Sequence, residues 1–155
     1  MLPPSFESAA EFLADATALD AAGADCLCAN GSGEGEWVVL GAAAAVTHKA
    51  RLAIVAKGDL APEPLSTLQR VSGGRVIVFD HGDPVERLIV RGAEPAELWT
   101  EIAMPVGRKA WNEALAAQEA AGASGVIVPW DSRLLDLLRN PGDEDDRSDL
   151  LMSTG

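Results

Sequence analysis

Asp80 and His81 form the adjacent pair of side chains best suited to acid–base chemistry. Imidazole titrates near neutral pH and a carboxylate beside it can orient it, so the pair fits the roles of general acid and general base. It follows an apolar run at residues 76–79, in a segment at residues 80–84 that predicts a tight turn. Such residues are also common in turns, so the sequence leaves a catalytic pair and an ordinary turn as alternatives.

Other polar side chains follow the remaining predicted strands, where α/β sheets bind their ligands. We predict that a cofactor would bind through Asn30, Lys57, Ser132 and Arg133. The helix that begins near Ser132 could hold a phosphate on its free N–H groups, with Arg133 supplying charge. Asp131 at the cap would occupy the same donors, so capping is the alternative there. For Asn30 and Lys57 the alternative is an ordinary surface position.

Metal, nucleotide and nucleic-acid sites find little support. Cys26 and Cys28 lie two residues apart in an apolar run, so on a strand both point to one face and we expect reduced core thiols. Neither His48 nor His81 has the spacing of a zinc site, so no metal is expected. The glycine-rich loop at residues 31–35 lacks the lysine of a P-loop. The net charge of −12 would repel nucleic-acid phosphates and anionic lipid.

Chain length and hydrophobicity predict one domain with a substantial core. The chain has 155 residues, of which 48% are apolar. No apolar stretch approaches the ~20 residues that span a bilayer, and the acidic start does not resemble a signal peptide. We therefore expect a cytoplasmic protein with a single α/β domain at residues 1–141. Residues 142–155 carry an acidic cluster, which predicts a flexible tail or, alternatively, a docking tail for a basic partner.

Helical patterns alternate with short apolar runs in the first half of the chain. Helices are predicted at residues 5–22, 37–47 and 65–71, and strands at residues 25–29, 51–56 and 75–79. Ser5 is the expected N-cap of the first helix, and Gly23 is its expected C-terminal stop. This alternation predicts a mostly parallel sheet with flanking helices, either open or part of a barrel.

The second half departs from this alternation. The turn at residues 80–84 leads at once to a strand at residues 87–90, and so short a connection can form only an antiparallel hairpin. The pattern then predicts a helical turn at residues 94–99, an edge strand at 100–106, a helix at 108–121, a strand at 125–129 and a closing helix at 134–138. One β-hairpin is therefore expected within the mostly parallel sheet.

Several segments share a spacing of apolar, glycine and polar residues that is typical of one enzyme family. They are residues 19–25 (LDAAGAD), 36–47 (EWVVLGAAAAVT), 51–52, 67–77 (TLQRVSGGRVI) and 119–129 (EAAGASGVIVP). These segments resemble the bacterial luciferase-like monooxygenases. The stretch Ser72, Gly73, Gly74 and Arg75 is the most specific part of the resemblance.

The resemblance implies a (β/α) barrel and reduced flavin chemistry, with FMN or a deazaflavin lying across the carboxyl ends of the strands. The chain departs from the family in length, because a complete barrel needs roughly 250 residues. No first strand of the family precedes the opening helix, and residues 79–83 replace glycines that let the cofactor approach. We therefore expect an incomplete, TIM-barrel-like domain.

Two functional hypotheses follow. In the first, the protein is a shortened luciferase-like oxidoreductase that binds flavin or deazaflavin and a small-molecule substrate. In the second, it is a non-catalytic descendant that acts as an oligomeric interaction or scaffold protein. Four tryptophans near element boundaries, together with the open edges of an incomplete barrel, predict a homo-oligomer. A hydrolase or isomerase that uses the Asp80 and His81 pair is a weaker third hypothesis, since no nucleophile signature accompanies it.

Overall fold

Six strands form one curved sheet in the computed structural model, which describes residues 1–3, 7–31, 33–84 and 86–139. In chain order and in sheet order they are β1 (Cys26–Ala29), β2 (Arg51–Val55), β3 (Val76–His81), β4 (Arg87–Val90), β5 (Leu98–Glu101) and β6 (Gly125–Ile127). β1, β2 and β3 are parallel, as are β5 and β6, whereas β4 is antiparallel to both neighbours. All strands except β4 therefore present their carboxyl ends at the same end of the sheet.

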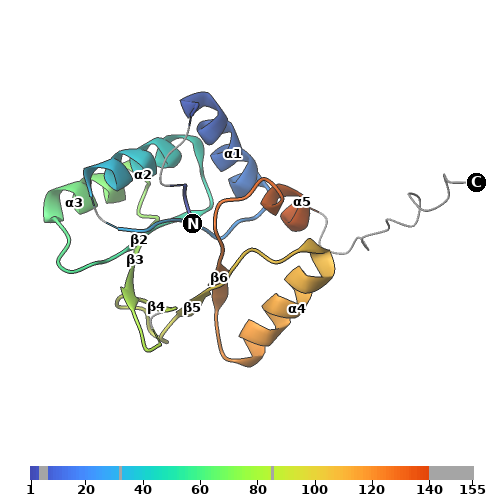
Figure 1. Cartoon of the computed structure of the whole chain (residues 1–155). Helices are drawn as coiled ribbons and strands as arrows, with labels where there is room; N and C mark the ends of the chain where they lie inside the picture. Colours follow the sequence, from blue (N-terminus) through green and yellow to red (C-terminus); the bar gives the residue numbers. More distant parts are fainter. Residues whose placement is uncertain (4–6, 32, 85, 140–155) are drawn as a thin grey trace, which may run out of the picture.

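The sheet curls until its two edge strands, β1 and β6, face each other across a gap (Figure 1). Residues at the start of the chain bridge this gap. The N–H group of Leu2 donates to the carbonyl of Cys28 at 2.6 Å, and the nitrogen of Met1 donates to the carbonyl of Val128. The sheet is thus a nearly closed barrel. The strand pairings confirm the predicted α/β class and the mostly parallel sheet.

Helices cover much of the outside of this sheet. They are α1 (Ala9–Ala21), α2 (Glu34–Val46), α3 (Pro62–Val71), α4 (Gly107–Ala120) and α5 (Leu134–Arg139). Figure 1 shows α1, α2 and α3 as one layer over β1 to β3, with α4 beside β6 and α5 next to α1. Ser8 caps α1 by accepting a hydrogen bond from the N–H of Glu11, whereas the predicted cap, Ser5, lies outside the described residues. The predicted tail at residues 142–155 also lies outside them.

None of the helices that the structure describes is both long enough and apolar enough to cross a membrane.

Side chains alternate between the barrel interior and the outer, helix-covered face, as the period of a strand requires. The interior contains Cys28, Ala53, Val55, Phe79, Leu88, Val90, Trp99 and Ile127. The intervening residues, such as Leu27, Leu52 and Ile54, pack outward against the helices. Cys26 joins Cys28 on the inner face, and both are free thiols as expected. Burial raises the pKa of Cys28 to about 12, so its thiol stays protonated in this packed interior.

A polar cluster lies in the interior at the amino end of β2. The guanidinium of Arg51 donates two hydrogen bonds to Glu97, at 2.9 and 2.6 Å, and lies 5.3 Å from the centroid of the Trp99 ring. Trp99 in turn donates from Nε1 to the same carboxylate at 2.8 Å. The hydrogen bond from Arg51 lowers the pKa of Glu97. The Glu97 carboxylate thus accepts hydrogen bonds from both Arg51 and Trp99, and these contacts hold the Trp99 ring in place.

Replacing Glu97 with Gln should cost about 1 kcal/mol, because a charge-assisted bidentate pair becomes a neutral hydrogen bond at a partly exposed site. The pKa of Glu97 is lower in the folded chain than in the unfolded chain. Its contribution is therefore present above the ordinary carboxyl pKa and is lost as the pH falls through the lowered value. Urea unfolding of the wild type and of Glu97→Gln at pH 7 and at pH 3 measures this contribution to the free energy of unfolding. A cost for Glu97→Gln that is as large at pH 3 as at pH 7 would contradict the assignment.

A second polar network holds the loop between α2 and β2. The buried carboxylate of Asp20 on α1 accepts three backbone hydrogen bonds, from the N–H groups of His48 (2.9 Å), Lys49 (2.9 Å) and Ala50 (2.6 Å). Arg75, just before β3, donates to carbonyls of the same region, at Ala44, Thr47 and Ala50, and to the Thr47 hydroxyl. We call this network the loop brace: Asp20, residues 47–50 and Arg75. It ties α1, α2 and β3 together.

Three sequence predictions are wrong. Asp80 and His81 belong to β3 rather than to a turn, because both pair with residues of β4. The predicted helical turn at residues 94–99 and edge strand at residues 100–106 are replaced by β5, a central strand between β4 and β6. The predicted antiparallel hairpin is confirmed, since β3 pairs with β4, and β5 adds a second antiparallel pairing with β4 that the sequence did not predict. In each of the wrong predictions, pairing with a neighbouring strand overrides the local proline and turn signals.

Candidate functional site

The predicted acid–base pair is split across the two faces of β3. Successive strand residues point to opposite faces, so Asp80 and His81 do not face one another. Asp80 instead accepts two hydrogen bonds from Arg91, at 2.9 and 2.5 Å, and those bonds lower its pKa. By the same alternation, His81 follows Ile77 and Phe79 onto the inner face, at the carboxyl end of the barrel.

The predicted phosphate site after β6 is occupied by an internal ion pair. Asp131 accepts hydrogen bonds from the backbone N–H, the Nε and a terminal nitrogen of Arg133, at 2.9, 2.8 and 2.7 Å. The side-chain hydrogen bonds from Arg133, followed by its backbone N–H, lower the pKa of Asp131 to about 2. A phosphate would have to displace this carboxylate. Ser132 is exposed between the two.

Asn30 and Lys57 lie where the sequence placed them, directly beyond the carboxyl ends of β1 and β2. Both are exposed. They share this end of the barrel with His81 and Arg133, but the structure does not gather the predicted residues around one cavity, because none of them lines the pocket described next. Within the described residues, no group of three His, Cys, Asp or Glu side chains is arranged to hold a metal ion.

A pocket of about 540 Å³ opens at the carboxyl ends of β5 and β6. We call it the Glu101 pocket. Its walls are mostly apolar and come from Met1, Leu2, Pro3, Ile102, Ala103, Ile127, Val128, Pro129 and Trp130, and its two acidic side chains are Glu86 and Glu101. Its volume falls within the range of small-molecule sites, roughly 300–1,000 Å³. The position, beyond the carboxyl ends of parallel strands, is where barrel enzymes and binding proteins hold their ligands.

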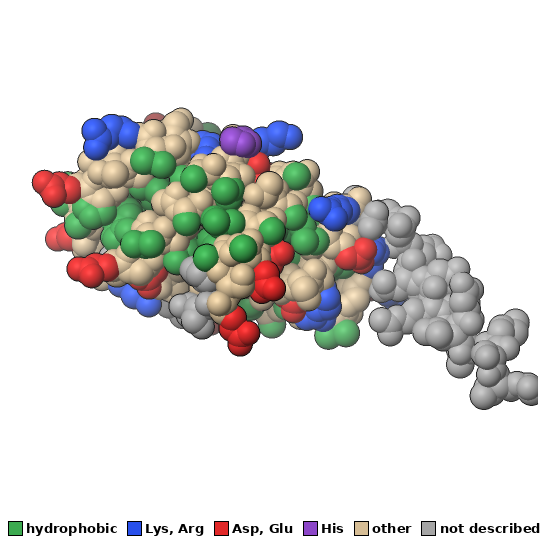
Figure 2. All heavy atoms as spheres, turned by 90° about the horizontal axis from the view of Figure 1, so that it is seen from above, with side chains coloured by type: hydrophobic (Ala, Val, Ile, Leu, Met, Phe, Trp, Pro, Cys, Tyr) green, Lys and Arg blue, Asp and Glu red, His purple; other side chains and the backbone are tan. Residues whose placement is uncertain are grey.

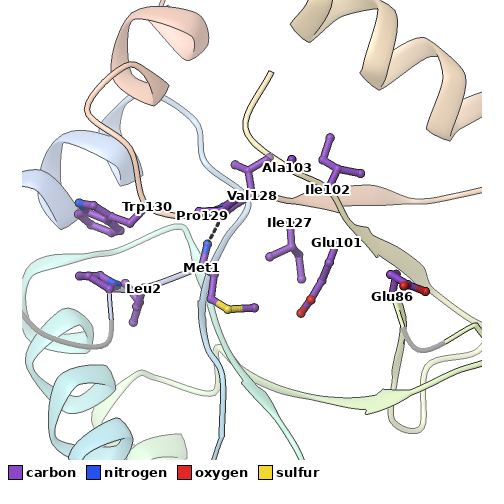
Figure 3. A pocket seen from close by; sticks show the side chains of 11 residues that line it. Met1, Leu2, Glu86, Glu101, Ile102, Ala103, Ile127, Val128, Pro129 and Trp130 are labelled. Atoms are coloured by element: carbon purple, nitrogen blue, oxygen red, sulfur yellow. Dashed lines mark hydrogen bonds between the residues drawn. The ribbon is translucent and has the colours of Figure 1, made fainter. Parts of the chain in front are cut away.

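Strand pairing positions the two carboxylates. Glu101 is the last residue of β5 and pairs with Ile127 of β6, so it follows Trp99 onto the inner face. Its N–H donates to the carbonyl of Glu86 at 2.8 Å, which places Glu86 beside it just before β4. Figure 3 shows the Glu101 side chain pointing into the space between Met1 and Glu86, with Ile127 beside it. The two residues are therefore neighbours on the pocket wall, although the Glu86 side chain points away from that of Glu101 in Figure 3.

The amino group of Met1 is the basic group on this pocket's wall. It donates to the carbonyl of Val128, as the dashed line in Figure 3 marks. Burial lowers the pKa of this amino group, against smaller opposing effects of Cys28, Cys26 and Glu101. The lowered pKa increases its neutral fraction near neutral pH. The pocket wall thus carries more acidic than basic side chains, a charge balance that favours a cationic over an anionic ligand.

An exposed apolar groove runs between α2 and α3 on the outer helix layer. It is lined by Trp37, Leu68 and Thr67, and flanked by Val38 and Val71, whose exposed fractions are 72% and 57%. Figure 2 looks down on this helix layer and shows apolar side chains spread across it, with acidic groups along one rim. These valines are the most exposed of the large apolar side chains described in the two helices.

The sequence reasoning missed Met1, Leu2, Glu86, Glu101 and Trp130 as pocket residues. Glu101 carried a usable signal, because it ends a run of strand-forming residues just as Asn30 and Asp80 do. The predicted helical turn and edge strand obscured it. Met1 and Leu2 carried no signal, since two residues show no periodicity.

Comparisons with family models, with curated proteins and with solved structures found no match to the chain.

Proposed function

We propose that the protein binds a small, mostly apolar molecule bearing a cationic amine in the Glu101 pocket. The observation that carries this proposal is the combination of an apolar cavity at the carboxyl end of the barrel with the acidic side chain of Glu101 on its wall and a second acidic residue, Glu86, beside it in the backbone. Apolar walls supply affinity through burial of the ligand's hydrocarbon part. Glu101 is half-buried, so its attraction for an amine is screened less by water than that of an exposed carboxylate.

A series of probes that are similar in shape and differ in charge tests this proposal. The probes are 2-phenylethylamine, 2-phenylethanol and phenylacetate, which share a ring and chain length and differ in charge. Titration followed by tryptophan fluorescence should show the amine binding at about 1 mM or tighter, with the alcohol weaker and the carboxylate weakest. Trp130 on the pocket wall supplies the signal.

Glu101→Gln should reduce amine affinity about tenfold and leave alcohol affinity unchanged, because it removes the charge and keeps the shape. Glu86→Gln should have a smaller effect, since Glu86 is exposed. Glu94→Gln, an exposed carboxylate absent from the pocket wall, is the matched control and should change neither affinity. Equal binding of all three probes, or an amine preference that survives in Glu101→Gln, would refute the proposal.

Flavin or deazaflavin binding, implied by the resemblance to luciferase-like monooxygenases, stays a separate proposal. The phosphate of FMN would face two carboxylates in the Glu101 pocket, so it would have to bind elsewhere at this end of the barrel, near Lys57 or Arg133. Titrating FMN and a deazaflavin, each oxidised and reduced, in the same fluorescence assay distinguishes flavin binding from amine binding. Micromolar flavin binding without amine binding would favour the oxidoreductase hypothesis.

Self-association likewise stays a prediction. One of the two reasons for it, the open edges of an incomplete barrel, is weakened by the near closure of the sheet, and the other is the position of the tryptophans near element boundaries. The exposed Val38 and Val71 beside the α2 and α3 groove provide another apolar surface from which an interface between copies would be built.

A further inference from the structure

The barrel is closed at one end of its gap and open at the other. β1 and β6 are the two edges of the sheet and do not pair with each other. At the carboxyl end, Leu2 bonds to Cys28 of β1 while Met1 bonds to Val128, the residue after β6. A segment that bonds to both neighbours occupies a strand position, so the gap is one strand wide, roughly 10 Å between the flanking strands.

A cleft of about 380 Å³ continues this gap toward the amino ends of β1 and β6. We call it the seam cleft. Its walls include Cys26 and Trp99 from the inner face of the sheet, together with Leu19, Trp111 and Leu137 from the helices outside. A cavity lined from both faces passes through the sheet itself. The seam cleft therefore lies where a strand is missing, between Met1 and the amino ends of β1 and β6.

The backbone groups beside the cleft also indicate a missing strand. In a strand, successive residues direct their N–H and C=O groups alternately to the two sides. The carbonyl of Asp25 accepts a hydrogen bond from Arg51 of β2, and the carbonyl of Cys28 accepts one from Leu2 on the opposite side of β1. Cys26 lies one residue after Asp25 and two before Cys28, so its N–H and C=O groups point to the same side as those of Cys28, into the cleft. On the other side of the cleft, the carbonyl of Ile127 accepts a hydrogen bond from Ile102, which follows β5. By the same alternation, the backbone N–H and C=O groups of Val126 point into the cleft. Polar backbone groups in apolar surroundings require partners, which an apolar small molecule would not supply.

We propose that the seam cleft binds an extended, apolar peptide segment of a partner protein, which pairs with Cys26 and Val126 as an added strand in line with Met1 and Leu2. Strand addition satisfies the free backbone groups, and alternate side chains of the peptide fill the inner and outer halves of the cleft. Asp25 is the acidic group at the cleft, and the chain carries a net charge of −12. The peptide therefore has basic residues flanking its apolar core.

The probe is the synthetic peptide acetyl-Lys-Val-Leu-Val-Val-Lys-amide, titrated into the full chain and followed by fluorescence of Trp99 and Trp111. Its matched control is the same peptide with alternate backbone nitrogens methylated, which keeps the apolar surface and removes the strand hydrogen bonds. The control should bind at least about tenfold more weakly. Amide hydrogen exchange in the complex should slow at Cys26 and Val126. Equal binding of both peptides, no binding of either, or unchanged exchange at these two amides would overturn the proposal.

Two variants on α4 locate the site. Leu115 is 37% exposed and lines the cleft, so Leu115→Lys should weaken binding of the basic peptide about tenfold by repulsion at its entrance. Ala120→Lys adds the same charge at an exposed position of α4 outside the cleft and should leave affinity unchanged. Equal effects of both variants would also overturn the proposal. Neither residue lines the Glu101 pocket, so the amine probes remain an independent test of that site.

Discussion

Asp20→Ala should destabilise the protein by about 3 kcal/mol, because three backbone N–H groups lose their shared acceptor and the one at Ala50 is buried. For a chain of this size the melting temperature should fall by roughly 6–12 °C. Urea unfolding followed by tryptophan fluorescence measures the difference. An unchanged m value would show that the loss lies in stability rather than in the size of the transition.

The pH dependence of this variant provides a second measurement. Burial raises the pKa of Asp20, but hydrogen bonds from Ala50, His48 and Lys49, together with the charge of Arg75, outweigh it and leave the pKa below its usual value. The carboxylate therefore stabilises the fold above the ordinary carboxyl pKa, and the gain disappears as the pH falls through the lowered value. The difference in the free energy of unfolding between wild type and Asp20→Ala should therefore become smaller at acidic pH. Asp15→Ala, on the same helix, is the control and should cost less than about 0.5 kcal/mol.

Gly125→Ala should cost about 2–3 kcal/mol through overpacking. A Cβ atom at this position would lie 2.7–2.9 Å from three carbons of the Trp99 ring. That ring cannot move aside freely, since its Nε1 is bonded to Glu97, Arg51 lies over its face, and Phe79 packs against it with ring centroids 5.8 Å apart. Thermal unfolding measures the loss.

Gly41→Ala is the matched control for Gly125→Ala. A Cβ atom at Gly41, in the interior of α2, would meet nothing within 4 Å. The same methyl group should there stabilise the protein by about 0.5–1 kcal/mol, because alanine loses less backbone entropy in a helix than glycine does. If the two substitutions changed stability in the same direction, the close approach of Trp99 to β6 would not be the cause of the loss of stability in Gly125→Ala.

The sequence predicted elements well where local pattern and tertiary structure agree. Residues 51–56 and 87–90 show compact apolar runs with clear boundaries, and β2 and β4 lie there. It failed at β5, where Pro95 and Pro105 indicated a helix start and a broken edge, because the pairing that makes residues 98–101 a strand comes from β4 and β6. The turn prediction for Asp80 and His81 failed for the same reason, since β4 pairs with both.

The candidate site was less predictable than the fold. The carboxyl-end rule placed Asn30 and Lys57 at one end of the predicted sheet, and both residues do lie beyond the ends of their strands. The Glu101 pocket is nevertheless made by residues that meet only through long-range contacts: Met1 beside Val128, and Glu86 beside Glu101. No local pattern encodes which strand ends adjoin the gap of a barrel.

The loop brace bears on how the resemblance to a known enzyme family should be understood. Asp20, Thr47 and Arg75 come from three of the segments that carry the resemblance, and all three serve to fasten one loop to its neighbours. Any chain that winds helices and parallel strands in this order faces the same loop, whatever its barrel mouth binds. The presence of these three residues is therefore accounted for by folding alone. None of them lines the Glu101 pocket or the seam cleft, so they record how the chain is held together and not which ligand it binds.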